Sequence, residues 1–202
     1  MRDSFGDSNF LILSIPMHFK ALICDLDETL IRSGHIYDEV QLKAAEKFDI
    51  PLTLELLHLH HGLSFPNVIR MYKQVDDAEM ETIRMFCRRE VANRISQFAW
   101  HDGAEDLLDQ GRKIPIGIAT TSHEKSVDIV DTRLEVRRRV KAIVHGNDVK
   151  SHKPDPACLY MVAERLGVFP NHCAYVGDSI VDVEAAKNAC MRAILIERPK
   201  TP

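Results

Sequence analysis

The chain has 202 residues, of which 45% are hydrophobic and 28% are charged, the balance of an ordinary globular protein. Its formal net charge is −4, whereas a nucleic-acid-binding surface is usually basic. No apolar run reaches the ~18 residues that a transmembrane helix needs. We therefore expect a globular protein without nucleic-acid or membrane partners. The sequence leaves its oligomeric state open between monomer and dimer.

The cysteines are odd in number and contain no closely spaced pair. There are five, at positions 24, 87, 158, 173 and 190. Free thiols in or beside buried strands behave as small hydrophobic groups, and this usage is typical of a reducing compartment. The sequence therefore predicts a cytoplasmic protein.

Residues 1–16 do not fit the rest of the pattern. Their apolar stretch, residues 10–13, is too short for a signal peptide, and Arg2 is followed by acidic residues. We expect a poorly ordered N-terminal extension, with Met17 as the natural start because the first strand follows it at once.

Five short apolar runs indicate strands. They lie at residues 20–24, 114–119, 141–145, 173–177 and 192–196. The runs are almost continuously apolar, as expected of parallel strands that are covered on both faces. Helical patterns at residues 124–136, 155–166 and 180–189 separate the last four. This alternation predicts an α/β fold with a Rossmann-like, doubly wound parallel sheet.

The first two strands are separated by a long helical stretch without a convincing strand, residues 36–99. Helical patterns cover residues 37–48, 52–59, 66–72 and 78–98. In the last of these, apolar residues form a broad stripe near the helical period. The sequence therefore predicts a small helical bundle inserted after the first strand.

Chemically active side chains follow four of the predicted strands. In chain order they are an acid pair, a run of hydroxyls, a lysine and a second acid pair: Asp25 and Asp27; Thr120, Thr121 and Ser122; Lys153; Asp178 and Asp182. Alone, the first pair could equally cap a helix or form a turn. Because ligands of open α/β sheets bind at the carboxyl ends of the strands, the four groups together predict one site.

The order, spacing and structural context of these motifs resemble the haloacid dehalogenase superfamily, whose members are mostly phosphatases. The resemblance spans Asp25 to Asp182, nearly the whole chain, and points to the branch of phosphoglycolate phosphatase and β-phosphoglucomutase. It implies an α-helical cap at residues 36–99 and an α/β core formed by residues 17–35 and 100–202.

The resemblance also implies roles for the acids. Asp25 is expected to be the nucleophile and a Mg²⁺ ligand, a carboxylate route to an aspartyl-phosphate. Asp27 would give its backbone carbonyl to the metal, while its side chain acts as general acid and then general base. Asp178 is expected to complete the carboxylate ligands, with Asp182 as a supporting acid near the metal or Lys153. Mg²⁺ prefers such oxygen ligands.

The hydroxyl run and the lysine are expected to hold the phosphate. Thr120 and nearby backbone N–H groups would bind a phosphate oxygen at the start of a helix, with Thr121 and Ser122 as alternatives. The competing interpretation is that Ser122 caps the helix that begins near Glu124. Lys153 would neutralise the negative charge that gathers at the site.

A loop in the helical stretch is a candidate for substrate recognition. Residues 60–64 resemble the cap loop that faces the substrate in related enzymes, which makes Gly62 and Ser64 candidate binding residues. The neighbouring histidines at positions 58, 60 and 61 lack the spacing that suits a zinc site on a helix. His101 is expected to belong to the hinge that returns from the cap.

Three positions bear on rival activities. Tyr37 and Phe65 occupy positions where phosphomutases of the β-phosphoglucomutase type have a histidine and an arginine, which disfavours that chemistry. Asp27 disfavours a dehalogenase, which lacks this acid. Phosphonoacetaldehyde hydrolase needs a cap lysine, and nothing marks Lys43, Lys47 or Lys73 as buried.

One residue departs from the family pattern within the first motif. Most members of the branch have glycine where this chain has Glu28. The added bulk and charge are expected to alter how the cap closes or how the loop packs.

The function that the sequence predicts is Mg²⁺-dependent hydrolysis of a small phosphorylated metabolite through an aspartyl-phosphate. A phosphomutase and a non-catalytic binding or regulatory protein on the same scaffold are the alternatives. The substrate stays open among phosphoglycolate, sugar phosphates, nucleoside monophosphates and pyrophosphate.

Overall fold

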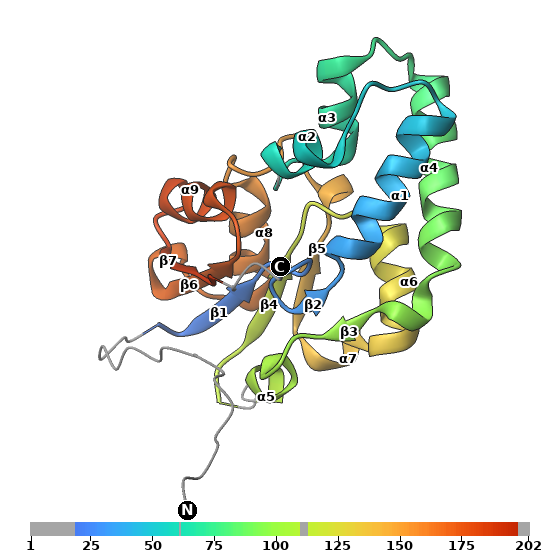
Figure 1. Ribbon diagram of the computed structural model, residues 1–202. Coiled ribbons are helices and arrows are strands. Elements are labelled where there is room, and N and C mark those ends of the chain that lie inside the picture. The colour runs from blue at the N-terminus through green and yellow to red at the C-terminus, as the bar shows by residue number, and fades with distance from the viewer. Residues whose placement is uncertain (1–18, 61, 110–112, 198–202) are drawn as a thin grey trace, which may run out of the picture.

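The computed structural model describes residues 19–60, 62–109 and 113–197 (Figure 1). The predicted N-terminal extension, residues 1–16, lies outside the described residues, as does His61. Within the described ranges no helix has both the length and the apolar character needed to cross a lipid bilayer.

The centre of the molecule is a five-stranded parallel sheet with the strand order β5-β4-β1-β6-β7. The strands are β1 (Ala21–Cys24), β4 (Ile116–Ala119), β5 (Ala142–Val144), β6 (Cys173–Gly177) and β7 (Arg192–Leu195). Leu22 of β1 lies between Ile116 of β4 and Ala174 of β6. The five predicted strands and the α/β fold class are confirmed.

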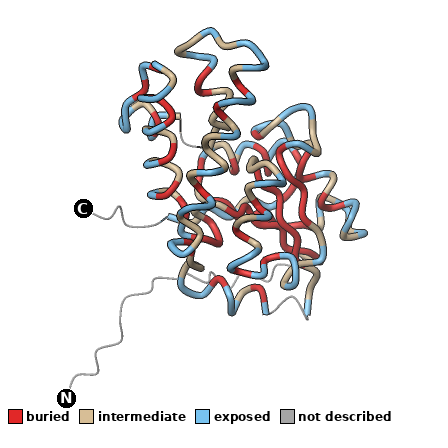
Figure 2. The backbone as a smooth tube through the Cα atoms, turned by 90° about the vertical axis from the view of Figure 1, so that its right-hand side faces the viewer, coloured by how far each residue is buried: buried red, intermediate tan, exposed pale blue. Residues whose placement is uncertain are grey.

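Helices cover both faces of this sheet. On one face Leu22 and Cys24 pack toward α5 (Ala104–Asp109), α6 (Glu124–Leu134) and α7 (Val136–Arg139). On the other face Ala21 and Ile23 pack against α8 (Ala157–Leu166) and α9 (Ile180–Asn188). The strands β1, β4 and β6 are buried along their whole length, in the red centre of Figure 2, whereas the edge strand β7 is mostly exposed. The strands read as continuous apolar runs because both of their faces are covered.

The helical segment expected at residues 124–136 is interrupted before its predicted end. Glu135 has a φ of 51°, in the left-handed region, which ends α6 at Leu134. Val136, at the start of α7, is fully buried. The turn therefore sends the chain back toward the sheet instead of letting the helix run on.

Residues 34–92, here called the helical insertion, form a second layer beside the sheet (Figure 1). The helices are α1 (Gly34–Lys47), α2 (Leu54–Leu59), α3 (Phe65–Tyr72) and α4 (Asp77–Ala92), and α1 packs along α4. The insertion has its own apolar cluster: Ala44, Ala45, Ile50, Leu52, Leu57, Val68, Ile69, Met80 and Ile83. This is the bundle that the apolar patterns predicted.

The base of the insertion differs from the sequence prediction. The helix expected to continue to Phe98 ends at Ala92, and a 3-10 turn follows at Ile95–Gln97. Then β3 (Ala99–Trp100) pairs antiparallel with β2 (Ile31–Arg32), a pair that the sequence did not predict. Phe98 is buried like the helical stripe before it, because it packs edge-on against Tyr37, with ring centroids 6.1 Å apart. An apolar residue at this position therefore made the helical pattern of the sequence seem to continue to residue 98.

Candidate active site

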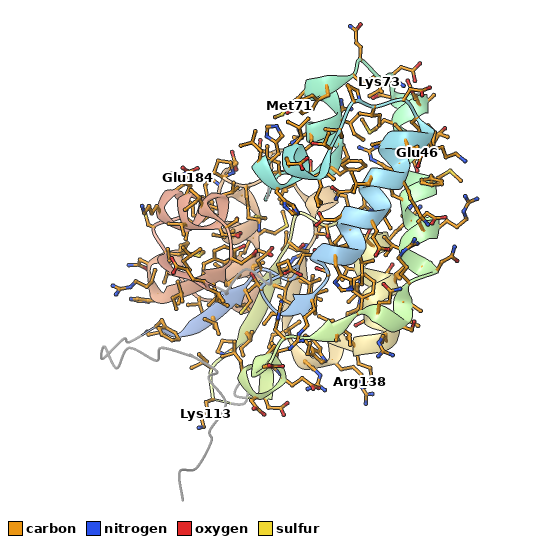
Figure 3. The ribbon with its side chains drawn as sticks, viewed as in Figure 1. Glu46, Met71, Lys73, Lys113, Arg138 and Glu184 are labelled. Atoms are coloured by element: carbon orange, nitrogen blue, oxygen red, sulfur yellow. The ribbon has the colours of Figure 1, made fainter. Side chains whose placement is uncertain are left out.

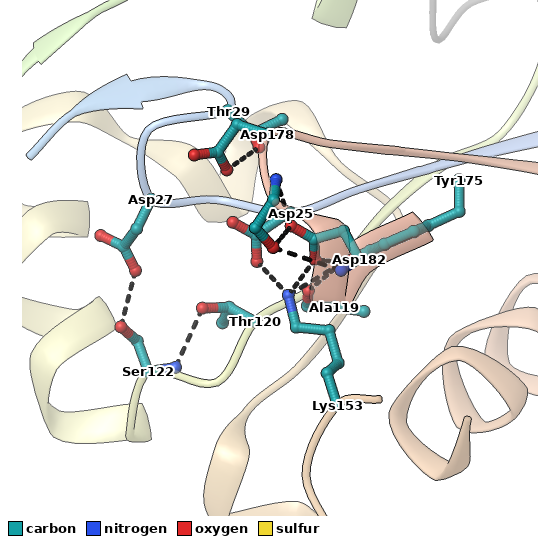
Figure 4. Close-up of polar contacts among 11 residues, drawn as sticks. Asp25, Asp27, Thr29, Ala119, Thr120, Ser122, Lys153, Tyr175, Asp178 and Asp182 are labelled. Atoms are coloured by element: carbon teal, nitrogen blue, oxygen red, sulfur yellow. Dashed lines mark hydrogen bonds and ion pairs between the residues drawn. The ribbon is translucent and has the colours of Figure 1, made fainter. Parts of the chain in front are cut away.

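The predicted motif residues meet at the carboxyl ends of the strands. Asp25 follows β1, Thr120 follows β4, and Asp178 follows β6 (Figure 4). Lys153 comes from the segment between β5 and α8, and Asp182 lies in the first turn of α9. Residues far apart in the sequence therefore face one another across a few ångströms.

Lys153 is the buried centre of this cluster, with its side chain only 4% exposed. Its Nζ donates to Asp25 Oδ1 at 2.7 Å, to Asp182 Oδ1 at 2.6 Å and to the Tyr175 hydroxyl at 3.0 Å. Burial lowers the pKa of Lys153, but Asp25, Tyr175 and Asp182 outweigh it, and the pKa stands well above the usual lysine value. The lysine is therefore a fixed positive charge.

Three carboxylates beside Lys153 could share a cation. One oxygen each of Asp25, Asp178 and Asp182 lie within 4.8 Å of one another. Asp178 Oδ1 also accepts a 2.9 Å hydrogen bond from the Thr29 hydroxyl, which fixes the orientation of that carboxylate. An all-oxygen donor set of this kind fits Mg²⁺. Asp182 has less capacity left, because Lys153 and Ser179 already bind its two oxygens.

The pKa values of the two acids nearest Lys153 move in opposite directions. Burial raises the pKa of Asp25 well above its usual value; Lys153 opposes this shift, and the acids Asp182, Asp178 and Asp27 add to it. Burial also tends to raise the pKa of Asp182, but Lys153 and the hydrogen bonds from Ser179 and Tyr175 lower it overall. Asp25 thus carries the charge that most needs a further positive partner.

Asp27 is held separately from this cluster. Its Oδ2 accepts a 2.6 Å hydrogen bond from the Ser122 hydroxyl, on the loop after β4. Its Oδ1 is buried and has no hydrogen-bond partner among the described residues. Burial raises the pKa of Asp27, while the hydrogen bond from Ser122 lowers it. A carboxyl group with a raised pKa and an unused oxygen suits proton transfer.

The hydroxyl groups in the loop after β4 make other hydrogen bonds than the helix cap that the sequence suggested. Thr120 is buried, and its Oγ1 accepts a hydrogen bond from the Ser122 backbone N–H at 3.0 Å. Ser122 does not cap the following helix; that interpretation was wrong. His123 is the N-cap, and its Nδ1 accepts from the backbone N–H of Lys125. Ser122 is thereby free to hold Asp27.

A cavity of about 530 Å³ joins this cluster to the helical insertion. Its wall includes Asp25, Asp27 and Lys153 from the sheet side, and Gly62 and Ser64 from the loop between α2 and α3. Thr121 and Ser122 also line it, whereas Thr120 does not. The structure thus brings the predicted cap-loop residues to the same space as the acids.

The cap loop lies directly on the sheet side of the molecule. Gly62 has a φ of +90°, and a Cβ there would lie 3.0 Å from Ser179 Oγ and 3.3 Å from the Val181 Cβ. Only glycine combines that backbone conformation with that space. The insertion is therefore closed over the site.

Two positively charged side chains of the insertion also line the cavity. Arg84 and Arg88 of α4 line it opposite His123 of the loop after β4. Arg88 Nη2 pairs with Glu81 Oε1 at 2.6 Å, so part of its charge is already matched. Burial lowers the pKa of His123, and Arg88 and Arg84 lower it further.

Sequence reasoning missed three residues that support the site. Tyr175 lies inside β6, and its hydroxyl donates to Asp182 Oδ1 at 3.0 Å and lies 3.2 Å from the Ala119 carbonyl oxygen. Thr29 holds Asp178, and Ser179 holds Asp182. A phenol hydroxyl within a fully buried strand was the available signal, because a buried hydroxyl needs a partner.

Comparison with known proteins identifies the family. The model of the haloacid dehalogenase-like hydrolases matches residues 22–196. The chain belongs to the haloacid dehalogenase-like hydrolases. It is 26% identical over 182 residues to the phosphorylated carbohydrates phosphatase of Thermotoga maritima, covering 87% of this chain and 83% of that protein.

Two further known proteins are similar to this chain, one in sequence over part of its length and one in fold. The phosphoglycolate phosphatase of Escherichia coli is 35% identical over 80 residues, 40% of this chain and 32% of that protein. The solved structure of β-phosphoglucomutase from Clostridium difficile shares the fold, with a TM-score of 0.77 at 20% identity over 89% of this chain and 85% of that one. The predicted family and fold are confirmed, and the chain is a phosphatase of this family.

Proposed function

We propose that this phosphatase hydrolyses a small phosphorylated metabolite in a Mg²⁺-dependent reaction that passes through an aspartyl-phosphate on Asp25. The observation that carries the proposal is the arrangement around Lys153. One buried lysine holds Asp25 and Asp182 at 2.7 and 2.6 Å, while Asp27 is tied to Ser122 instead. Two acids from one motif thus have different surroundings and can take different roles.

Asp25 is the proposed nucleophile. One of its oxygens is engaged by Lys153, which leaves the other to attack phosphorus. Its raised pKa means that ionisation of Asp25 depends on added positive charge. Lys153 supplies part of it from within the protein.

Asp25, Asp178 and the backbone carbonyl of Asp27 are the proposed ligands of Mg²⁺, with Asp182 as a supporting acid through Lys153. Bound there, Mg²⁺ would supply positive charge to the nucleophile and to the transferred phosphoryl group. Thr29 would fix Asp178 in its ligating orientation, since the Thr29 hydroxyl donates to Asp178 Oδ1.

Asp27 is the proposed general acid and base. In the first step its carboxyl group gives a proton to the leaving oxygen of the substrate while Asp25 becomes phosphorylated. In the second step the Asp27 carboxylate takes a proton from water, which attacks phosphorus and releases phosphate from Asp25. The unpaired Oδ1 is the atom available for both transfers.

The turn after β4 and Lys153 are the proposed phosphate-binding groups. Thr121 and Ser122 line the cavity, and Thr120 braces them through the Ser122 N–H. The role predicted for the Thr120 hydroxyl itself, direct contact with a phosphate oxygen, stays a prediction.

The proposed cap is the segment of residues 36–99 that the sequence predicts, most of which lies in the helical insertion. Gly62 and Ser64 would contact the organic part of the substrate. The cavity of about 530 Å³ is within the usual range for small-molecule sites. Because all five cysteines are free thiols, we also propose a cytoplasmic location.

Two rival activities receive less support from the cavity wall. Tyr37 and Phe65 line it where a phosphomutase would need a histidine and an arginine. Lys73, a lysine considered for Schiff-base chemistry, lies at the outer end of the insertion (Figure 3) and donates to the Phe48 carbonyl and Glu79.

The test is a screen of phosphorylated metabolites with Mg²⁺, using D25N as the blank. We expect phosphate release from at least one small phosphomonoester, abolished by D25N and by chelation of the metal. Folded wild-type protein that binds Mg²⁺ yet releases no phosphate from a broad panel would favour the non-catalytic alternative.

A further inference from the structure

Glu28, which follows Asp27 in the first motif, has an unusual backbone conformation. Its φ is +56°, in the left-handed region that glycine adopts without penalty and other residues avoid. It lies in a tight turn, where its N–H donates to the Ile31 carbonyl and the Leu26 carbonyl accepts from Leu30 and Ile31. A non-glycine residue persists in such a conformation only where its surroundings compensate.

The interactions that compensate for the left-handed backbone of Glu28 are made with the start of α1, the first helix of the insertion. Glu28 Oε1 accepts hydrogen bonds from the backbone N–H groups of Ser33 and Gly34, at 2.8 and 2.7 Å. Within the described part of the chain, the start of helix α1 shows no other cap: its N-cap Ser33 makes no side-chain capping bond, and its first turn contains no acidic residue. Glu28 therefore provides both the acceptor and the negative charge that a helix N-terminus favours.

Gly34 is matched to this carboxylate. A Cβ at position 34 would lie 3.0 Å from Glu28 Cδ and 3.2 Å from Oε1. A larger residue at position 34 would press on the carboxylate that caps the helix.

The same carboxylate reaches the segment by which the chain leaves the insertion. Glu28 Oε2 lies 3.9 Å from His101 Nε2, and the His101 backbone N–H donates to the Leu30 carbonyl at 2.9 Å. The chain enters the insertion through β2 and leaves it through β3, and these two strands pair with each other. Glu28 therefore contacts both the entering and the leaving segment.

We propose that Glu28 is a positioning residue of the phosphatase reaction, which holds the insertion closed over the acids by capping α1 and contacting the return segment. This rests on the proposed function, because a closed insertion matters only if the cavity takes a substrate. Glu28 itself has no contact with the reacting atoms in this proposal; it acts through the placement of α1.

The experiment combines amide hydrogen exchange with kinetics on three variants of the full chain. E28G removes the carboxylate and suits the left-handed backbone, so it should fold. E28Q keeps an acceptor oxygen at the same place. E135G is the matched control, because Glu135 has a nearly identical φ of 51° but lies between α6 and α7 on the sheet side.

We expect E28G to speed exchange in the first turn of α1 and around His101 by about tenfold, the loss of a typical helix cap. E28Q should stay within about threefold of wild type, and E135G should leave both segments unchanged. In E28G the KM for a metabolite substrate should rise by a similar factor with kcat preserved, because fewer molecules hold the binding-competent arrangement.

Unchanged exchange in E28G, equal acceleration by E135G, or E28Q as fast as E28G would each overturn the capping role. Faster exchange with an unaltered KM would overturn the positioning role. The exchange measurement needs no turnover, so failure of the proposed phosphatase reaction would be seen separately, as a wild type without activity whose exchange still depends on Glu28.

Discussion

The sheet and the helical insertion contribute different kinds of surface to one cavity. On the sheet side, Lys153 is buried and donates to the buried acids Asp25 and Asp182 at 2.7 and 2.6 Å. On the insertion side, Arg84 and Arg88 are more exposed, and both pair with Glu81 on their own helix. Buried charges keep one geometry because separating them is costly, whereas exposed pairs rearrange easily.

From this difference we expect the reaction steps to depend on the sheet side and substrate recognition to depend on the insertion side. The rigid sheet side suits steps common to many phosphate esters, which need fixed charges around phosphorus. The insertion side suits contacts that vary with the substrate. Substitutions on the two sides should therefore differ in whether their effects depend on the substrate.

Loss of the nucleophile is the largest expected effect. D25N should reduce kcat for every substrate by on the order of 10³-fold or more, because the group that forms the covalent intermediate is gone. The measurement is phosphate release from several esters. A residual rate that differs widely between esters would break the proposed division between the two sides.

Loss of the proton-transfer acid should come next, and it should depend on the leaving group. D27N should slow hydrolysis of alkyl phosphates by about 10² to 10⁴-fold, and an activated aryl phosphate far less, since that leaving oxygen needs little protonation. Steady-state rates on the two ester types, with the same enzyme stock, measure this. Equal losses would show that Asp27 is not the general acid.

The support for Asp178 can be tested through metal affinity. T29V removes the hydroxyl that donates to Asp178 at 2.9 Å and should weaken apparent Mg²⁺ affinity by about 10- to 100-fold, with kcat largely restored at high Mg²⁺. Activity as a function of Mg²⁺ concentration gives the answer. T132V is the matched control, since Thr132 makes a similar bond to a helix carbonyl on the surface. The same shift in both variants would contradict a specific role.

The smallest predicted effect is on stability. The folded-state pKa of Asp25 is raised, so its contribution to stability is present below its unfolded pKa and is lost as pH rises through the folded pKa. With chelator, the stability of wild type relative to D25N should therefore fall as pH rises from acid toward neutral. Thermal unfolding of both proteins across this pH range checks this. Added Mg²⁺ should make the fall smaller, and a difference in Tm that does not change with pH would contradict the raised pKa.

Asp182 should behave in the opposite way. Its folded-state pKa is lowered, so the stability that it contributes is present above its unfolded pKa and is lost as pH falls through the folded one. D182N should cost stability at neutral pH and cost less in acid. Urea unfolding at both pH values measures the difference, and a cost that is independent of pH would contradict the assignment.

The sheet and the family could be predicted from the sequence because their signals are local. Strands covered on both faces are continuous apolar runs, and three of the four motifs begin directly after a strand. The base of the insertion could not be predicted. The strands β2 and β3 have only two residues each, and buried Phe98 extended an apparent helical stripe beyond Ala92.

Within the site, the acids and Lys153 were predictable from type and order, but their partners were not. Tyr175 is indistinguishable from a core aromatic residue until its hydroxyl is placed beside Lys153 and Asp182. Which residue caps α6, His123, and which holds Asp27, Ser122, depends on where α6 begins. The role of Glu28 depends on a φ that the sequence does not reveal.

The central claim is that phosphate passes through Asp25 in two displacements, and the stereochemical course at phosphorus tests it most directly. A substrate made chiral with oxygen isotopes and sulfur would be hydrolysed in isotopically labelled water, and the configuration of the product determined. Two successive in-line displacements predict overall retention. Inversion would show a single attack by water and would contradict an aspartyl-phosphate on Asp25.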